Sequence, residues 1–173
     1  YPAVWSYFTQ EAYGWTALDV GISLMSFGLA IAIVQGFAIR YFIRWMGEAN
    51  TALFGLAMNG VAFVLFVFTD AGWQAYAIIA ITTLGAVTMP SLQGMMSQRV
   101  GNDEQGELQG VLVSTQSIGS ILSPLAMTGV FWYFTSDDAP IYLPGAPFAL
   151  AAVLTFAGLL LFITRQRSDP KPA

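Results

Sequence analysis

The side chains that could take part in recognition chemistry are amides and hydroxyls set within long apolar stretches. They are Gln35, Asn59, Gln93, Gln109, Gln116, Ser114, Thr115, Ser117, Ser120 and Ser123. Such groups donate and accept hydrogen bonds, but they do not exchange a proton near neutral pH. The sequence has no Cys and no His, which excludes thiolate chemistry, disulfides and most zinc sites within it. The pattern predicts hydrogen-bond recognition.

Motifs for catalysis and for nucleic-acid binding are absent from the sequence. It has no nucleophile elbow, metal-ligand cluster or phosphate-binding loop, and a Ser without a His to activate it is inert. Six basic residues are too few for a nucleic-acid interface. We therefore expect neither an enzyme nor a nucleic-acid binder, and we expect no metal or cofactor.

Gln93 is the most informative of the amides, because it lies three residues after Pro90. A proline removes a backbone donor, and the wide turn that results often marks a cavity in a transport protein. Met89, Gln93 and Ser97 share one helical face. Gln93 either lines such a substrate cavity or makes a bond between helices worth about 0.6 to 2 kcal/mol.

A second polar stripe consists of Ser114, Ser117 and Ser120, which recur at a spacing of three residues. Small residues at that spacing mostly let helices approach closely, and they can also line a pathway. The same alternatives, packing or pathway contact, stay open for Gln35 and Gln116.

These side chains lie in or beside five apolar stretches, residues 20–39, 49–69, 71–98, 108–136 and 139–164. Each stretch meets the roughly 20 residues that a helix needs to cross a bilayer. Only 9% of residues are charged, whereas about a quarter are charged in soluble domains. The sequence predicts an all-α integral membrane protein with five complete transmembrane helices, of which the third and fourth are kinked at Pro90 and Pro124.

The remaining segments are short. Residues 1–9 are apolar and aromatic but cannot cross a bilayer, so we expect the outer end of a sixth helix there. Residues 10–164 form the five-helix part, with an inner loop at residues 40–50. Residues 165–173 form a polar cytoplasmic tail.

The positions of the charges predict the orientation. The basic residues are Arg40, Arg44, Arg99, Arg165, Arg167 and Lys171. Every second gap between the apolar stretches holds acids alone. Because cytoplasmic loops are rich in Lys and Arg, the basic gaps and the C-terminus are expected in the cytoplasm.

Two further segments resemble a known family. Residues 89–97 (MPSLQGMMS) and 105–110 (QGELQG) resemble the tenth and eleventh helices of tetracycline-resistance-type drug exporters of the major facilitator superfamily. The Phe8–Thr9, Gly14–Trp15 and 20–24 segments resemble the join between helices seven and eight. The family's gating and loop motif corresponds to Arg40, Arg44, Gly47, Glu48, Gln105, Gly106, Gln109 and Gly110.

The resemblance implies the C-terminal half of a twelve-helix exporter, from the end of helix seven to helix twelve, in the bacterial inner (plasma) membrane. The implied function is export of an amphiphilic small molecule by proton antiport, together with an N-terminal half. The expected pathway residues are Gln35, Met89, Gln93, Ser97, Ser114, Gln116 and Ser117. Because no apolar stretch contains an ionisable Asp, Glu, Lys or Arg, the residues that couple transport to protons are expected in the N-terminal half.

Two departures from the family pattern leave the substrate open. Asn59 stands where these exporters have an aspartate, and Ala49–Asn50 replaces a basic pair. One alternative is a non-transporting receptor or assembly module with the same fold. A channel is disfavoured, because no stretch carries the ring of charge expected of an ion filter.

Overall fold

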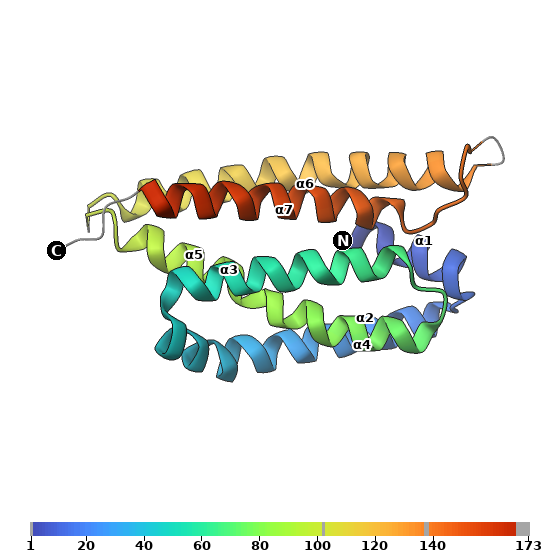
Figure 1. Ribbon diagram of the computed structural model, residues 1–173, viewed down its shortest axis with the longest axis horizontal. Coiled ribbons are helices and arrows are strands. Elements are labelled where there is room, and N and C mark those ends of the chain that lie inside the picture. Colours follow the sequence, from blue (N-terminus) through green and yellow to red (C-terminus); the bar gives the residue numbers. More distant parts are fainter. Residues whose placement is uncertain (1, 102, 137–138, 169–173) are drawn as a thin grey trace.

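The computed structural model describes residues 2–101, 103–136 and 139–168, and within these ranges all the regular structure is helical (Figure 1). In chain order the elements are α1 (Pro2–Tyr13), α2 (Ala17–Ile33), the π-helical turn η1 (Val34–Ala38), α3 (Ile39–Val67), α4 (Gly72–Leu84), the 3₁₀ turn η2 (Gly85–Val87), α5 (Thr88–Ser97), α6 (Gln105–Thr135) and α7 (Ala146–Ser168). The predicted all-α class is confirmed.

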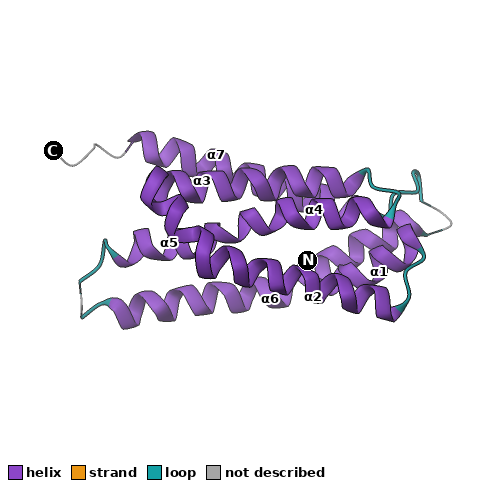
Figure 2. Ribbon diagram, turned by 90° about the horizontal axis from the view of Figure 1, so that it is seen from below, coloured by secondary structure: helices purple, strands orange, loops and turns teal. Residues whose placement is uncertain are grey.

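Among the described residues, four continuous helical stretches are long and apolar enough to cross a membrane. The first, Ala17–Val67, contains a sharp turn at Gly47, whose φ of 75° lies in the left-handed region that glycine tolerates. The chain reverses direction there, so this stretch makes two passes along the bundle (Figures 1 and 2). Divided at Gly47, the bundle has five long apolar passes.

Three boundaries differ from the sequence prediction. The inner loop expected at residues 40–50 is wrong, because the helix continues through residues 40–46 and the turn needs only Gly47. The last helix begins at Ala146, after Pro140 and Pro144, and it runs to Ser168 instead of ending at residue 164. The fourth pass is one continuous helix through Pro124.

The end of the bundle that holds α1 is stabilised by a cluster of buried aromatic rings from three helices. Trp5 and Phe8 of α1 meet Phe66 of α3 and Phe148 of α7, with ring centroids 4.7 Å apart for Phe8 and Phe148 and 5.3 Å apart for Trp5 and Phe66. Trp5 Nε1 also donates to Ser23 Oγ of α2 at 2.9 Å. Aromatic pairs of this kind stabilise by about 0.5 to 1.5 kcal/mol beyond their burial.

Two tyrosines make contacts between segments at this same end of the bundle. Burial raises the pKa of Tyr13 to about 12, with a smaller opposing effect of its hydrogen bond to Thr69 and a further increase from Asp70. The Tyr142 hydroxyl donates to the Glu11 carboxylate, and this bond raises the pKa of Tyr142. Both hydroxyls therefore keep their protons at physiological pH, and that of Tyr142 donates to Glu11.

Helix α3 is the central element of the bundle. It packs against α7 on one side and against α4, η2 and α5 on the other. Helix α6 packs against α1 and α7 and only slightly against α5, and most of its side chains are exposed. Helices α2 and α6 thus present large apolar surfaces that the described chain does not cover.

Candidate substrate pathway

The third pass is interrupted near its middle. Helix α4 ends at Leu84, a 3₁₀ turn occupies Gly85–Val87, and α5 begins at Thr88. Pro90 explains the position of the interruption, since a proline ring cannot bond to the carbonyl four residues earlier, which is that of Ala86. The break therefore lies just before Pro90, where the sequence predicted a kink.

Gln35 supplies a donor to the Ala86 carbonyl. Its Nε2 lies 3.2 Å from Ala86 O, although the two residues are 51 positions apart in the chain. Gln35 belongs to η1, where a π-helical turn replaces the α-helix of the first pass. A π-helical turn holds one residue more than an α-helical turn, which redirects the side chains on it. Such turns are frequent at functional sites.

A second amide reaches the same break from the opposite helix. Asn59 Nδ2 of α3 donates to Gly85 O at 3.2 Å, and Thr88 Oγ1 donates to the same carbonyl at 2.8 Å. A Cβ at Gly85 would lie 2.3 Å from the Asn59 amide carbon. A Cβ at Gly55 would lie 2.3 Å from Thr88 Oγ1. Glycine on each partner thus allows the helices to approach closely.

The three residues of the face predicted around Gln93 differ in their contacts. Met89 is 44% exposed, and Gln93 is half-buried and makes no side-chain hydrogen bond to the described residues. Ser97 is occupied, because its Oγ donates to Gln105 Oε1 at 2.9 Å while Gln105 Nε2 donates to Ser97 O at 2.8 Å. Met89 and Gln93 are therefore the residues of this face that remain available to a ligand.

The polar residues of α6 do not join this group. Ser114, Gln116 and Ser117 are exposed, and Ser117 Oγ donates to Val113 O of its own helix at 2.8 Å. In the part of the chain that the structure describes, none of the three bonds to another helix. Gly106, Gln109 and Gly110 are also exposed on the first turns of α6.

At the end of the bundle that carries the Arg residues, Glu48 connects two passes. Gln98 Nε2 donates to both Glu48 carboxylate oxygens at 3.1 Å, and a Cβ at Gly94 would lie 2.7 Å from Glu48 Oε1. Glu48 therefore packs on the end of α5. The sequence places Asn102 and, three residues later, Gln105 in the pattern of a helix cap before α6. Asn102 lies outside the described residues, and Gln105 bonds to Ser97 as given above.

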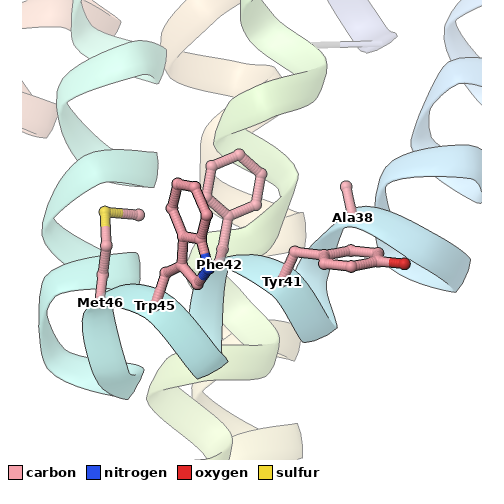
Figure 3. A pocket seen from close by; sticks show the side chains of 5 residues that line it. All are labelled: Ala38, Tyr41, Phe42, Trp45 and Met46. Atoms are coloured by element: carbon pink, nitrogen blue, oxygen red, sulfur yellow. The ribbon is translucent and has the colours of Figure 1, made fainter.

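Beside Gly47 lies an open apolar hollow of about 410 Å³ (Figure 3). Its lining residues are Ala38, Tyr41, Phe42, Trp45 and Met46. Figure 3 shows these five side chains on the turn, and the Phe42 ring stacks on that of Phe54 with centroids 5.2 Å apart. Arg40 and Arg44 are exposed on the same segment. Exposed arginines beside exposed aromatic rings are typical of the headgroup region of a bilayer.

Sequence reasoning missed the contact of Asn59 with Gly85 and the role of Gln98. It also missed Ser91, whose Oγ is buried without a hydrogen-bond partner among the described residues. The spacing of Gly55 and Asn59, four residues apart on one helical face, was the available signal for a close helix crossing.

A family model describing the Major Facilitator Superfamily matches residues 1–173, so the chain belongs to this superfamily of membrane transporters. The chain is 38% identical to the class G tetracycline resistance protein of Vibrio anguillarum and 35% identical to the class C protein of Escherichia coli, over 75% of this chain and 33% of each relative. The class D protein of Salmonella ordonez is 29% identical over 98% of this chain and 41% of its own length. The predicted resemblance to tetracycline exporters is confirmed.

The relatives are longer than this chain, which spans about a third of the length of the first two of them. The matched residues include the motif segments at 89–97 and 105–110 in the class D comparison, which covers nearly the whole chain. The alignment therefore concerns one part of a larger transport protein in each relative.

Proposed function

We propose that this chain is the C-terminal part of a secondary transporter that exports an amphiphilic small molecule. The observation that carries the proposal is the family match over the entire chain, together with relatives named for tetracycline resistance. In this assignment the passes correspond to the end of helix seven and to helices eight to twelve of a twelve-helix fold. Residues 1–9, 10–164 and 165–173 are the outer helix end, the five-helix part and the cytoplasmic tail.

We propose that the substrate moves along the face of the bundle that carries the third pass, which is interrupted at residues 85–87. Met89 and Gln93 supply a thioether and an amide next to the break. The other proposed pathway residues are Gln35, which also bonds to Ala86 O, Ser97, which also bonds to Gln105, and the exposed Ser114, Gln116 and Ser117 of α6. An apolar surface with a few polar groups suits an amphiphilic ligand. By the rocking mechanism, this part would tilt against an N-terminal half around a site near the midplane.

Proton antiport is proposed with the coupling carboxylates outside this chain. The apolar passes contain amides and hydroxyls in place of Asp, Glu or His, and an amide cannot bind and release a proton near neutral pH. Glu48 and Glu107 lie at the ends of passes, and Glu107 is exposed. Their expected contribution is to the conformational cycle alone.

Efflux by the full-length transporter tests the function. Cells that express it should accumulate less tetracycline or less of a lipophilic cationic dye than cells without it, and collapse of the pH gradient should abolish the difference. Glu48→Gln and Glu107→Gln should retain the dependence on the gradient. Unchanged accumulation of both probes would favour the receptor or assembly module instead.

Gln93→Leu is expected to change the rate or the substrate range of export, with the protein still present in the membrane. The reason is that the half-buried Gln93 amide has no described hydrogen bond to lose, and even one lost interhelical bond costs only about 1 kcal/mol. Efflux of the two probes, measured against the amount of protein in the membrane, checks this. The control is Gln10→Leu, at an exposed position of α1. A loss of membrane protein with Gln93→Leu would assign Gln93 to packing.

The proposed orientation places Asp70 outside and Glu104 in the cytoplasm. Both residues are exposed, so a single Cys at either position is accessible to solvent on its own side. In intact cells an impermeant thiol reagent should label the Cys at position 70 and spare the Cys at position 104, and lysis should make both reactive. The reverse pattern in intact cells would invert the proposed topology and place the C-terminus outside.

A further inference from the structure

We infer that Gln35 and Asn59 are positioning residues that form a two-amide clasp on the break in the third pass, and that the clasp sets the direction of α5 during transport. This inference rests on the proposed function. The clasp is defined as the hydrogen bonds from Gln35 Nε2 to Ala86 O and from Asn59 Nδ2 to Gly85 O, each 3.2 Å long.

The clasp is built on two successive carbonyls in the irregular segment. Pro90 has no N–H for Ala86 O, and Gln35 provides the donor that the helix lacks. Gly85 O begins the 3₁₀ turn, where it accepts from Thr88 N, from Thr88 Oγ1 and from Asn59. The donors come from different passes, so the break is held by two separate helices.

Irregular turns lie on one side of this contact, and glycines lie on the other. Gln35 lies in the π-helical turn η1, and η1 contacts η2, so two irregular turns of neighbouring passes meet. On the other side, Gly85 leaves room for the Asn59 amide and Gly55 leaves room for Thr88. Pro90 frees the Ala86 carbonyl, and the π-helical turn directs the Gln35 amide toward it.

The consequence concerns what lies beyond the break. Helix α5 carries Met89 and Gln93, and its far end is held by the contacts of Ser97 with Gln105 and of Gln98 with Glu48. Because the segment at 85–87 is a 3₁₀ turn and Pro90 has no N–H for Ala86 O, fewer backbone bonds oppose a change in the angle between α4 and α5 than in a regular α-helix. The hydrogen bonds from the neutral Gln35 and Asn59 amides hold one angle between α4 and α5, and they can be exchanged for others when the transporter changes state.

The clasp makes the side chain at position 59 a donor. Asn59 gives an N–H to Gly85 O, whereas an ionised carboxylate at that site could only accept and would face a carbonyl oxygen. This supplies a physical reason for an amide at the position where the resembling exporters have an aspartate. Asn59 therefore acts by holding the backbone at Gly85, and it exchanges no proton.

The test uses the full-length transporter, in lipid nanodiscs for the spin-label distances and in sealed proteoliposomes with a pH gradient for the transport of tetracycline. Spin labels at Trp73 and Gly101, exposed positions that flank the third pass and its break, report the angle of α5 as a distance distribution. Gln35→Met and Asn59→Leu remove the donors at similar volume. Each should shift the populations of the distance distribution and lower the transport turnover by about three- to tenfold, the change expected from one lost amide hydrogen bond. The KM should change less than the turnover does.

Pro90→Ala provides the decisive background, because alanine restores an N–H for Ala86 O. Gln35→Met should then have no further effect on the distance distribution, whereas Asn59→Leu should keep its effect. The control Thr155→Val removes a bond from Thr155 Oγ1 to Ala151 O within α7 and should leave both measurements unchanged. If Asn59→Leu does not fold, Gln35→Met alone decides, since Gln35 is exposed.

An unchanged distance distribution in both clasp variants would overturn the inference, as would a full effect of Gln35→Met in the Pro90→Ala background. The distance measurement does not require transport. If the unsubstituted protein transports neither tetracycline nor a dye, the proposed function fails, and the clasp is still judged from the spin-label distances.

Discussion

Gly145→Ala is expected to remove most of the folded protein from the membrane. A Cβ at position 145 would lie 2.7 Å from Val67 Cα and 2.8 Å from Val67 O. These are backbone atoms of α3, so the clash cannot be relieved by rotation of a side chain. Overpacking costs about 1 to 3 kcal/mol when side chains can adjust, and more is expected when two helices must separate. The amount of protein in the membrane and the melting temperature in detergent measure the effect.

Gly158→Ala is the matched control for this prediction. Gly158 lies within α7, the helix that begins directly after Gly145, and a Cβ there would meet no atom within 4 Å. In a helix interior the same substitution stabilises by about 0.5 to 1 kcal/mol, because alanine loses less conformational freedom than glycine. A melting temperature for Gly145→Ala equal to that of Gly158→Ala would show that α3 and α7 are not in close contact at this end.

The passes themselves could be predicted from the sequence, because the bilayer imposes length and apolarity on each one. The turn at Gly47 is shorter than predicted, since a single residue with positive φ reverses the chain and leaves the flanking residues helical. Polar content between residues 40 and 50 indicated a loop. The same residues, Arg40 and Tyr41 among them, belong to a helical segment.

The pathway residues were only partly predictable, for a different reason. Pro90 is a local signal, and a break does lie directly before it. The partner of the Gln35 amide is set by the packing of passes far apart in sequence, and the π-helical turn that carries Gln35 leaves no mark in the hydrophobic pattern. Gln105 was expected to cap α6 and instead bonds to Ser97, because the end of α5 lies within reach.

Phe148→Ala is expected to lower the stability of the protein by about 3 to 5 kcal/mol, the usual cost of deleting a buried phenyl ring. Phe148 is only 3% exposed, and its ring centroid lies 4.7 Å from that of Phe8 and 5.1 Å from that of Phe66. It therefore connects α7 with α1 and α3, and alanine would leave a cavity among these three helices. The measurement is the melting temperature in detergent, and the control is Phe68→Ala, whose ring is 78% exposed.

The same substitution should loosen α1 specifically, because Phe8 loses its nearest described aromatic partner. Thr9, on the next position of α1, is fully buried. A single Cys at position 9 should be shielded from a thiol reagent in the otherwise unchanged protein and should become reactive in the Phe148→Ala background. In the Phe68→Ala background it should stay shielded. A Cys at position 9 that remained shielded without the Phe148 ring would show that α1 is held by its contacts with α6 and by the bond from Trp5 to Ser23, with the aromatic cluster contributing little.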